Sequence, residues 1–165
     1  MIVEFTSVYD QYFDDIYRYV YVKTGNRWDA EDIVSETFRK AYENFSSLKD
    51  RSNLKAWLLT IARNTVYDYY RKKKSFLVKD EMDFYFEPLP FEDPFDQEGE
   101  MECLKKSLHH LSKEDLEITN LRYFAGLKFK EMSMVLERAE DTLRVKSHRI
   151  TKKIGVLMKK CLGES

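Results

Sequence analysis

Glycine and proline are scarce in this chain of 165 residues, which contains five Gly and three Pro. So few turn-forming residues leave little room for an all-β fold with many tight turns. The stretches between them are long and repeat apolar residues every three or four positions, which is typical of helices. The sequence therefore predicts an all-α protein.

Long apolar runs are absent as well. No stretch approaches the roughly 20 apolar residues that a helix needs to span a bilayer. Residues 1–10 lack the basic start and the apolar run of a signal peptide. We therefore expect a cytoplasmic protein.

Cysteine and histidine are few. Cys103 and Cys161 belong to no CxxC pair and have no histidine at metal-ligand spacing, so the sequence predicts neither a disulfide framework nor a zinc site, and both cysteines are expected to be reduced. The three histidines are expected on helix surfaces. A nucleophile elbow and a phosphate-binding glycine loop are also missing. We expect no enzyme activity, no metal or other cofactor, and no small-molecule substrate.

Charge is divided unevenly along the chain, although the net charge is −1. Residues 1–75 carry 13 Lys and Arg against 11 Asp and Glu, residues 76–100 carry 1 against 9, and residues 101–165 carry 14 against 9. All three prolines fall in the acidic segment, where they prevent a regular helix. We predict two small helical domains, 1–75 and 101–165, joined by an acidic linker over 76–100. Its aromatic residues Phe84, Tyr85, Phe86, Phe91 and Phe95 favour contact with a partner, although a disordered spacer is equally compatible with them.

Three helices are predicted in the first domain. The first covers 5–22 and ends before Gly25, and the second begins at Asp29 as its N-cap and continues to Phe45. A polar loop over 46–53 leads to the third helix. The exposed front of the second helix is acidic, which either complements the helix dipole or binds a basic partner.

The third helix, over 56–74, has two distinct faces. Its apolar residues form one stripe that predicts burial, with Trp57 assigned to the core. The opposite face carries cations, an amide and an aromatic ring, which suit nucleic acid because they neutralise phosphates, read base edges and stack on bases. A solvated basic face is the alternative interpretation. The residues of this face are Thr60, Arg63, Asn64, Tyr67, Arg71 and Lys74.

The second domain is predicted to contain a helix over 100–111, a helix capped by Ser112 that ends near Gly126, and two more over 129–136 and 141–158. The last two form a predicted helix-turn-helix. Its second helix lies in a stretch, 138–160, with eight Lys and Arg against two acids. That density is expected of a helix in a DNA major groove, although such helix pairs also occur in purely structural bundles.

Two strings of this sequence resemble the extracytoplasmic-function (ECF) sigma factors of bacterial RNA polymerase. DAEDIVSETFRKAYENF, followed by LLTIARN and YDYYRKKK, resembles their region-two domain, and LRYFAGLKFKEMSMVLERAEDTLRVKSHRITKKI is similar to their region-four domain. The resemblance covers nearly the whole chain in the family's order. It implies a subunit that binds core RNA polymerase, directs it to promoter DNA and opens the duplex, without catalysing a reaction.

The resemblance also implies roles for particular residues. Ser35 stands where the family usually has Gln, and Asp141, which would cap the recognition helix, stands where it commonly has Gly. The implied contacts with core polymerase are Glu31, Asp32, Ser35 and Glu36. The implied contacts with the single-stranded minus-ten element are Arg63, Asn64, Asp68, Arg71 and Lys72, with the loop over 46–53. The implied contacts with the duplex minus-thirty-five element are Thr142, Arg144, Lys146, His148 and Arg149.

Two further expectations follow from the resemblance. The acidic linker would enter the positively charged channel of polymerase as a mimic of nucleic acid. Many members of the family are held inactive by an anti-sigma factor, so such a factor is an expected partner. The alternative function is a helix-turn-helix regulator that binds duplex DNA through residues 112–160 independently of polymerase.

Overall fold

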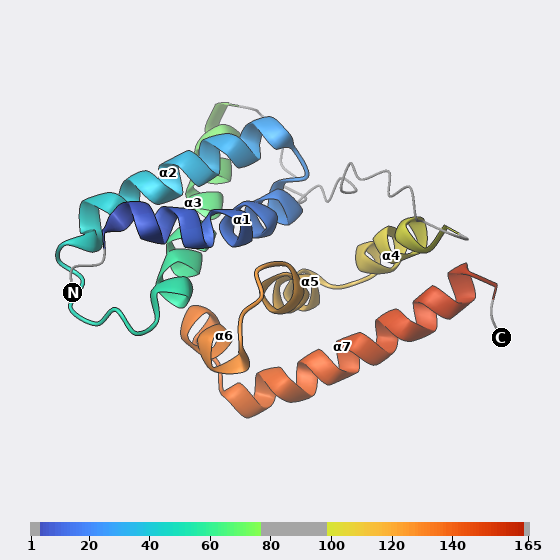
Figure 1. Ribbon diagram of the computed structural model, residues 1–165. Coiled ribbons are helices and arrows are strands. Elements are labelled where there is room, and N and C mark those ends of the chain that lie inside the picture. Colours follow the sequence, from blue (N-terminus) through green and yellow to red (C-terminus); the bar gives the residue numbers. More distant parts are fainter. Residues whose placement is uncertain (1–3, 77–98, 164–165) are drawn as a thin grey trace.

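The computed structural model describes residues 4–76 and 99–163, and every regular element in these two ranges is a helix. The all-α prediction is therefore confirmed. Figure 1 shows α1, α2 and α3, the N-terminal half, packed together, with the helices of the C-terminal half beside them. The elements are α1 (Phe5–Thr24), α2 (Arg27–Phe45), α3 (Leu54–Phe76), α4 (Glu100–His109), α5 (Lys113–Thr119), the π-helix η2 (Asn120–Phe124), α6 (Phe129–Leu136) and α7 (Glu140–Cys161).

The junction between α1 and α2 explains where both helices end. Gly25 adopts a left-handed conformation, with φ at 62°, and donates its N–H to the carbonyl of Tyr21 at 2.7 Å. The Asn26 side chain then accepts hydrogen bonds from the first N–H groups of α2. The prediction that Asp29 is the N-cap was wrong, because Asn26 directly follows the turn and occupies that position. Asp29 lies in the first turn of α2 and is buried.

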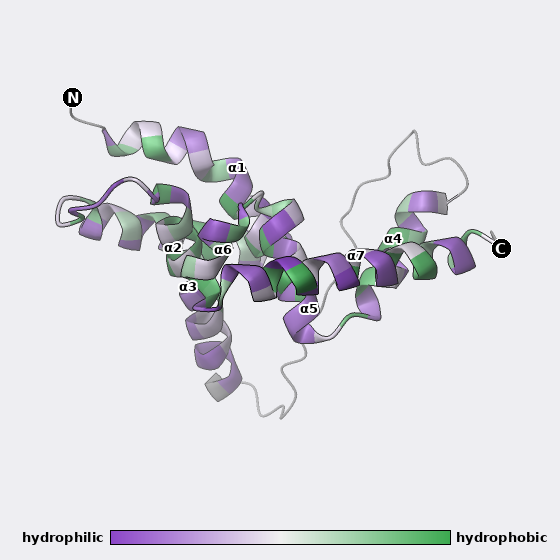
Figure 2. Ribbon diagram, turned by 90° about the horizontal axis from the view of Figure 1, so that it is seen from below, coloured by the Kyte–Doolittle hydropathy of each residue, from purple (hydrophilic) through white to green (hydrophobic). Residues whose placement is uncertain are grey.

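One apolar core connects the two halves of the chain. Ile16 and Ile33 are fully buried with Leu58 in the N-terminal half, and Leu121 and Met132 extend the same cluster into the C-terminal half. Figure 2 shows the hydrophobic residues gathered on the sides of the helices that face one another. Trp57 packs against this cluster, as predicted.

The C-terminal half contains a capped helix, α5, and the helix-turn-helix formed by α6 and α7. Ser112 accepts a hydrogen bond from the N–H of Asp115 at 3.1 Å, which confirms the predicted cap of α5. The bounds of α6 are those predicted. Ala139 occupies the N-cap position of α7, and its side chain forms no capping hydrogen bond. Asp141, which was predicted to be the cap, instead lies in the first turn of the helix.

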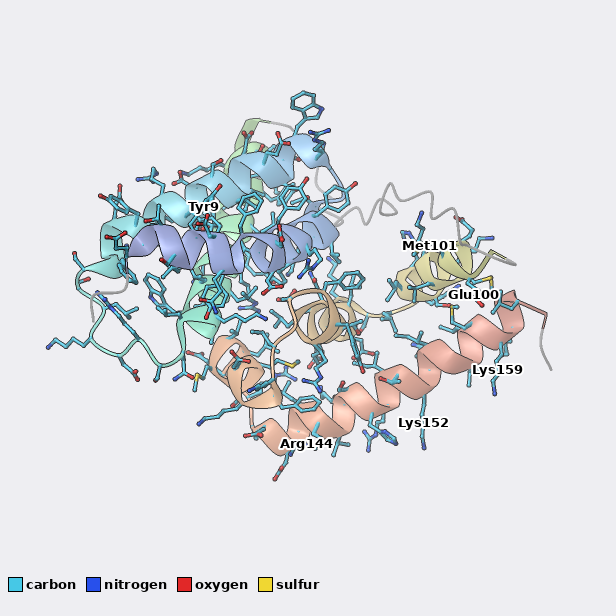
Figure 3. The ribbon with its side chains drawn as sticks, viewed as in Figure 1. Tyr9, Glu100, Met101, Arg144, Lys152 and Lys159 are labelled. Carbon is cyan, nitrogen blue, oxygen red and sulfur yellow. A yellow bond between two sulfur atoms is a disulfide. The ribbon has the colours of Figure 1, made fainter. Side chains whose placement is uncertain are left out.

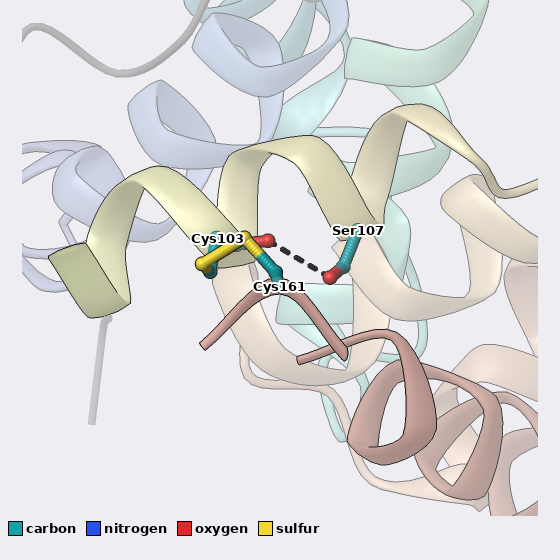
Figure 4. Close-up of a disulfide and its surroundings, with 3 residues drawn as sticks. All are labelled: Cys103, Ser107 and Cys161. Carbon is teal, nitrogen blue, oxygen red and sulfur yellow. Dashed lines mark hydrogen bonds between the residues drawn. A yellow bond between two sulfur atoms is a disulfide. The ribbon is translucent and has the colours of Figure 1, made fainter. Parts of the chain in front are cut away.

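The two cysteines form a disulfide between α4 and α7. Figure 4 shows Cys103 and Cys161 bonded; their Cα atoms are 5.6 Å apart and their sequence separation is 58. The prediction of two reduced cysteines was wrong. Neither residue has a local motif, and only the packing of α4 along the end of α7 brings them together.

The residues that the structure describes contain neither a membrane-spanning helix nor a cluster of metal-binding side chains. In residues 4–76 and 99–163, no helix is both long and apolar enough to cross a bilayer. The same ranges hold no group of three or more His, Cys, Asp or Glu that fits a metal ion. The predicted linker over 76–100 falls mostly at residues 77–98, outside the part of the chain that the structure describes.

Reduction of the disulfide is expected to lower the free energy of unfolding by about 2–4 kcal/mol, because the bond restricts the unfolded chain. Thermal unfolding followed by circular dichroism, with and without a thiol reductant, measures this difference. A Cys103→Ser, Cys161→Ser variant should show the lower Tm under both conditions. Identical Tm values for the oxidised and the reduced wild-type chain would contradict the prediction.

Candidate nucleic-acid interface

From its middle to its end, α3 carries the residues predicted to hold the minus-ten strand, and most of them are exposed. Asn64, Arg71 and Lys72 are exposed, and the Arg71 side chain is 78% accessible. Asp68 forms ion pairs with Arg71 at 3.5 Å and with Lys40 of α2 at 3.8 Å. This surface therefore presents cations and an amide to solvent, with one carboxylate that is already paired.

Arg63 belongs to the same predicted set but contacts the C-terminal half. Its Nε lies 3.3 Å from Oε1 of Glu117 in α5, and its guanidinium lies 5.3 Å from the ring centre of Tyr67. Its side chain is only 31% exposed. The structure therefore does not place Arg63 with the exposed cations of α3.

The exposed face of α2 is acidic but partly compensated by its own cations. Glu31 pairs with Arg27 at 3.0 Å. Glu36 accepts a hydrogen bond from Arg39 Nε at 2.9 Å, and this bond lowers the pKa of Glu36. The other two residues predicted to bind polymerase, Asp32 and Ser35, are exposed beside them.

A groove of about 360 Å³ between α2 and α3 joins the two predicted sites. Asp32 and Glu36, predicted to bind polymerase, line it together with Asp68 and Lys72, predicted to bind DNA. These residues are far apart in sequence. Their proximity comes from the packing of α2 against α3, which the sequence patterns did not show.

A buried carboxylate anchors the end of α3 to the start of α2. Asp29 accepts hydrogen bonds from the hydroxyl groups of Tyr69 at 2.8 Å and Tyr70 at 3.3 Å, and from Lys73 Nζ at 3.1 Å. Burial, together with the neighbouring Asp29, raises the pKa of Tyr69 to about 12 and also raises that of Tyr70. The sequence patterns did not show this cluster, because Asp29 lies on α2 and its partners lie on α3.

The face of α7 that points away from the other helices is cationic. Figure 3 shows Arg144, Lys152 and Lys159 along this side of the helix. Leu143 and Ile150 point inward and are buried. The basic face is therefore held outward by an apolar stripe on the opposite side of α7.

The predicted minus-thirty-five contacts on α7 are not all equivalent. Thr142, His148 and Arg149 are exposed. Arg144 is also exposed but forms ion pairs with Glu140 and Asp141, each at 3.1 Å. Lys146 instead pairs with Glu114 of α5 at 2.7 Å. The structure thus brings four of the five residues to the surface and turns Lys146 toward α5.

Comparison with known proteins decides the family. Residues 8–76 match the family described as Sigma-70 region 2. The ECF RNA polymerase sigma factor SigM of Bacillus subtilis is 30% identical over 152 residues, which cover 92% of this chain and 93% of SigM. The chain belongs to the ECF RNA polymerase sigma factors.

Other members of the family are similar over most of this ECF sigma factor. BldN of Streptomyces coelicolor is 28% identical over 158 residues, covering 93% of this chain, and the chain spans 60% of the length of BldN. The structure of the sigma factor RpoE of Bartonella quintana, in complex with the anti-sigma factor NepR, matches with a TM-score of 0.76 and 24% identity over 94% of this chain and 96% of RpoE. The structure of CnrH in complex with the cytosolic domain of CnrY matches with a TM-score of 0.68 and 17% identity over 94% and 88%. These two structures share its fold.

The region-two match of this ECF sigma factor coincides with the N-terminal half. Residues 8–76 contain most of α1 and all of α2 and α3. The groove between α2 and α3 and the cluster around Asp29 therefore both lie within region two.

The stability of this ECF sigma factor is expected to fall as the pH rises from 10 to about 12. The unfolded chain releases the Tyr69 proton near the ordinary pKa of 10.0, whereas the folded chain keeps it until about 12. Deprotonation over this window therefore favours the unfolded state, and below pH 10 the contribution is complete. Denaturant unfolding from pH 9 to 12 measures the decline. Tyr69→Phe should decline less steeply, and equal slopes would contradict the prediction.

Proposed function

We propose that this ECF sigma factor binds core RNA polymerase, directs it to promoter DNA and helps to separate the strands. Residues 1–75 and 101–165 serve as its two DNA-contacting domains, joined by residues 76–100. The observation that carries the proposal is the groove between α2 and α3. In this groove Asp32 and Glu36, which we propose to bind polymerase, lie beside Asp68 and Lys72, which we propose to bind DNA. Docking of polymerase on α2 therefore brings it beside the strand held by α3.

Contact with polymerase is ionic in this proposal. The acidic face of α2 fits a basic surface. The ion pairs that its acids form with Arg27 and Arg39 of the same helix are exposed to solvent. Exposed pairs of this kind contribute about 0–1 kcal/mol, so cations of a partner can replace them at little cost. Glu31 and Glu36 then become available together with Asp32 and Ser35.

In this proposal the minus-ten strand binds to the C-terminal part of α3, from Asn64 onward. Separation of a duplex costs about 1.4 kcal/mol per base-pair step on average, so the single strand must be bound as it forms. Arg71 and Lys72 are exposed for phosphate contacts, and Asn64 is exposed for a base edge. The hydrogen bonds of Tyr69 and Lys73 to Asp29 hold this end of α3 in place.

In this proposal α7 lies in the major groove of the minus-thirty-five duplex and recognises its sequence. Thr142, His148 and Arg149 lie on its exposed surface. Arg144 also contacts the duplex once contacts with DNA replace its ion pairs with Glu140 and Asp141. A bidentate contact from one arginine to guanine contributes roughly 1–3 kcal/mol of discrimination between bases.

An anti-sigma factor is a further proposed partner, since RpoE, which shares this fold, was solved with one bound.

The polymerase contact is tested by reversing two charges in the groove. Asp32→Lys, Glu36→Lys should weaken co-purification with bacterial core RNA polymerase at least about tenfold, because attraction to a basic surface becomes repulsion. Asp10→Lys, Glu43→Lys changes the net charge equally, at exposed sites of α1 and α2 that do not line the groove, and should bind as the wild type does. Circular dichroism confirms that both variants are folded.

Either of two results would count against this assignment. If both folded variants bind polymerase as the wild type does, the acidic face of α2 is not the contact. If the wild-type chain does not bind polymerase but binds a specific duplex by itself, the chain acts as an independent helix-turn-helix regulator.

Recognition by α7 is tested at Arg149. Arg149→Gln should weaken binding of the holoenzyme to a minus-thirty-five duplex about tenfold and relax its preference at one base pair. Lys159→Gln removes a charge near the other end of the same helix and should change the affinity less than about twofold. Fluorescence anisotropy with labelled duplexes at fixed salt measures both. An unchanged affinity and preference for Arg149→Gln would show that this side chain does not read bases.

A further inference from the structure

An aromatic ring lies between two arginines where the helix-turn-helix meets η2. Phe129, the first residue of α6, is partly buried and packs against the shared core. The guanidinium of Arg122 in η2 lies 4.3 Å from the centre of this ring, and that of Arg144 in α7 lies 5.2 Å from it. Both distances are within the range of a cation–π contact. One ring therefore connects three elements of the C-terminal half.

The two arginines face different surroundings. Arg122 is partly buried, and its Nη1 donates to the backbone carbonyl of Leu127 at 2.9 Å. Because Leu127 is fully buried, Arg122 is held from the protein side. The Arg144 side chain is 54% exposed and belongs to the set predicted to contact the minus-thirty-five duplex. The ring thus has an anchored cation as one neighbour and a solvent-facing cation as the other.

The position of the ring is fixed by the start of α6. The backbone N–H of Lys128 donates to Glu131 Oε1 at 2.9 Å, which defines where this helix begins. Phe129 follows directly, and its packing against the core restrains the ring further. A rigid neighbour of this kind can select one geometry of a long side chain such as that of Arg144.

Arg144 has two kinds of contact, and DNA affects them differently. Its ion pairs with Glu140 and Asp141 occupy N–H groups at the edge of the guanidinium, which a guanine also needs. The same guanidinium lies over the Phe129 ring. A planar guanidinium that stacks on a ring uses its face and leaves its edge for other partners. A duplex must therefore replace the two carboxylates but need not displace the ring.

We propose that Phe129 positions Arg144 for the minus-thirty-five duplex, by holding the face of its guanidinium while the edge bonds to a base. This inference rests on the proposed function, because it concerns one of the base contacts of α7. A long side chain loses rotamer freedom when it binds, and this loss opposes binding. A guanidinium already held by a ring has lost part of that freedom before DNA binds. Phe129 touches no base in this arrangement and acts only through Arg144.

A double-mutant cycle tests the positioning role. Fluorescence anisotropy of the holoenzyme, with labelled duplexes changed at one base pair at a time, shows which base preference Arg144→Gln loses. Phe129→Leu keeps an apolar side chain and removes the ring. It should lower the same preference about threefold to fivefold, the usual effect of an exposed cation–π contact. In the Arg144→Gln background it should change binding less than about 1.5-fold, and equal effects in both backgrounds would overturn the proposal.

Two further variants separate positioning from a general disturbance of the fold. Phe129→Tyr restores the ring and should restore the preference that Phe129→Leu loses. Tyr123→Leu is the matched control, because it removes a ring that contacts α7 at Thr151, away from Arg144. This control should keep the preference of the wild type. A loss of affinity at every base pair in Phe129→Leu, without a change in preference, would overturn the positioning role.

Nuclear magnetic resonance of the free, full-length chain tests the contact without polymerase or DNA. The Nε–H proton signal of Arg144, identified by its loss in Arg144→Gln, should be shifted upfield by the ring current of Phe129. Phe129→Leu should return this signal to the ordinary arginine range, and an unchanged signal would overturn the contact. If the signal moves but Arg144→Gln leaves duplex binding unchanged, the proposed function fails at Arg144 and the positioning role fails with it. The two failures are therefore distinguishable.

Discussion

Ile16, Leu58 and Leu121 are fully buried in one apolar cluster that the two halves of the chain share. Most of the arrangement depends on burying this cluster, because its apolar area provides the main free energy of packing. The described helices other than α4 turn their apolar stripes toward this cluster and their charged residues outward, whereas α4 packs against a second cluster that includes Val22. The acidic face of α2 and the basic face of α7 are exposed for the same reason. A polar group at the boundary of the cluster must instead find a partner inside the protein.

Two buried carboxylates meet that requirement in different ways. Asp29 pairs with Tyr69, Tyr70 and Lys73 within the N-terminal half, and so fixes the direction of the last turns of α3. Glu117 pairs with side chains of the other half, and so fixes how the halves meet. The first supports a surface proposed for DNA, whereas the second joins the two halves of the chain.

Charge compensation within single helices has a similar effect on the exposed faces. Glu31 and Glu36 of α2 are paired with arginines of their own helix, and Arg144 of α7 is paired with acids of its first turn. These pairs are exposed and weak, so they limit nonspecific attraction without blocking a stronger partner. Lys146 differs, because its pair with Glu114 connects α7 to α5 instead of lying within one helix.

Local sequence determined the helices of this protein, and tertiary packing determined which residues meet. Local sequence patterns predicted α6 with its observed bounds, the Ser112 cap, the turn at Gly25 and the packing of the partly buried Trp57 against the core. Each of these depends on neighbours within about one helical turn. The Asp29 cluster, the groove between α2 and α3, the ion pair of Arg63 with Glu117 and the bond between Cys103 and Cys161 involve residues far apart in sequence. No periodicity encodes such contacts, since they exist only after the helices pack side by side in one particular register.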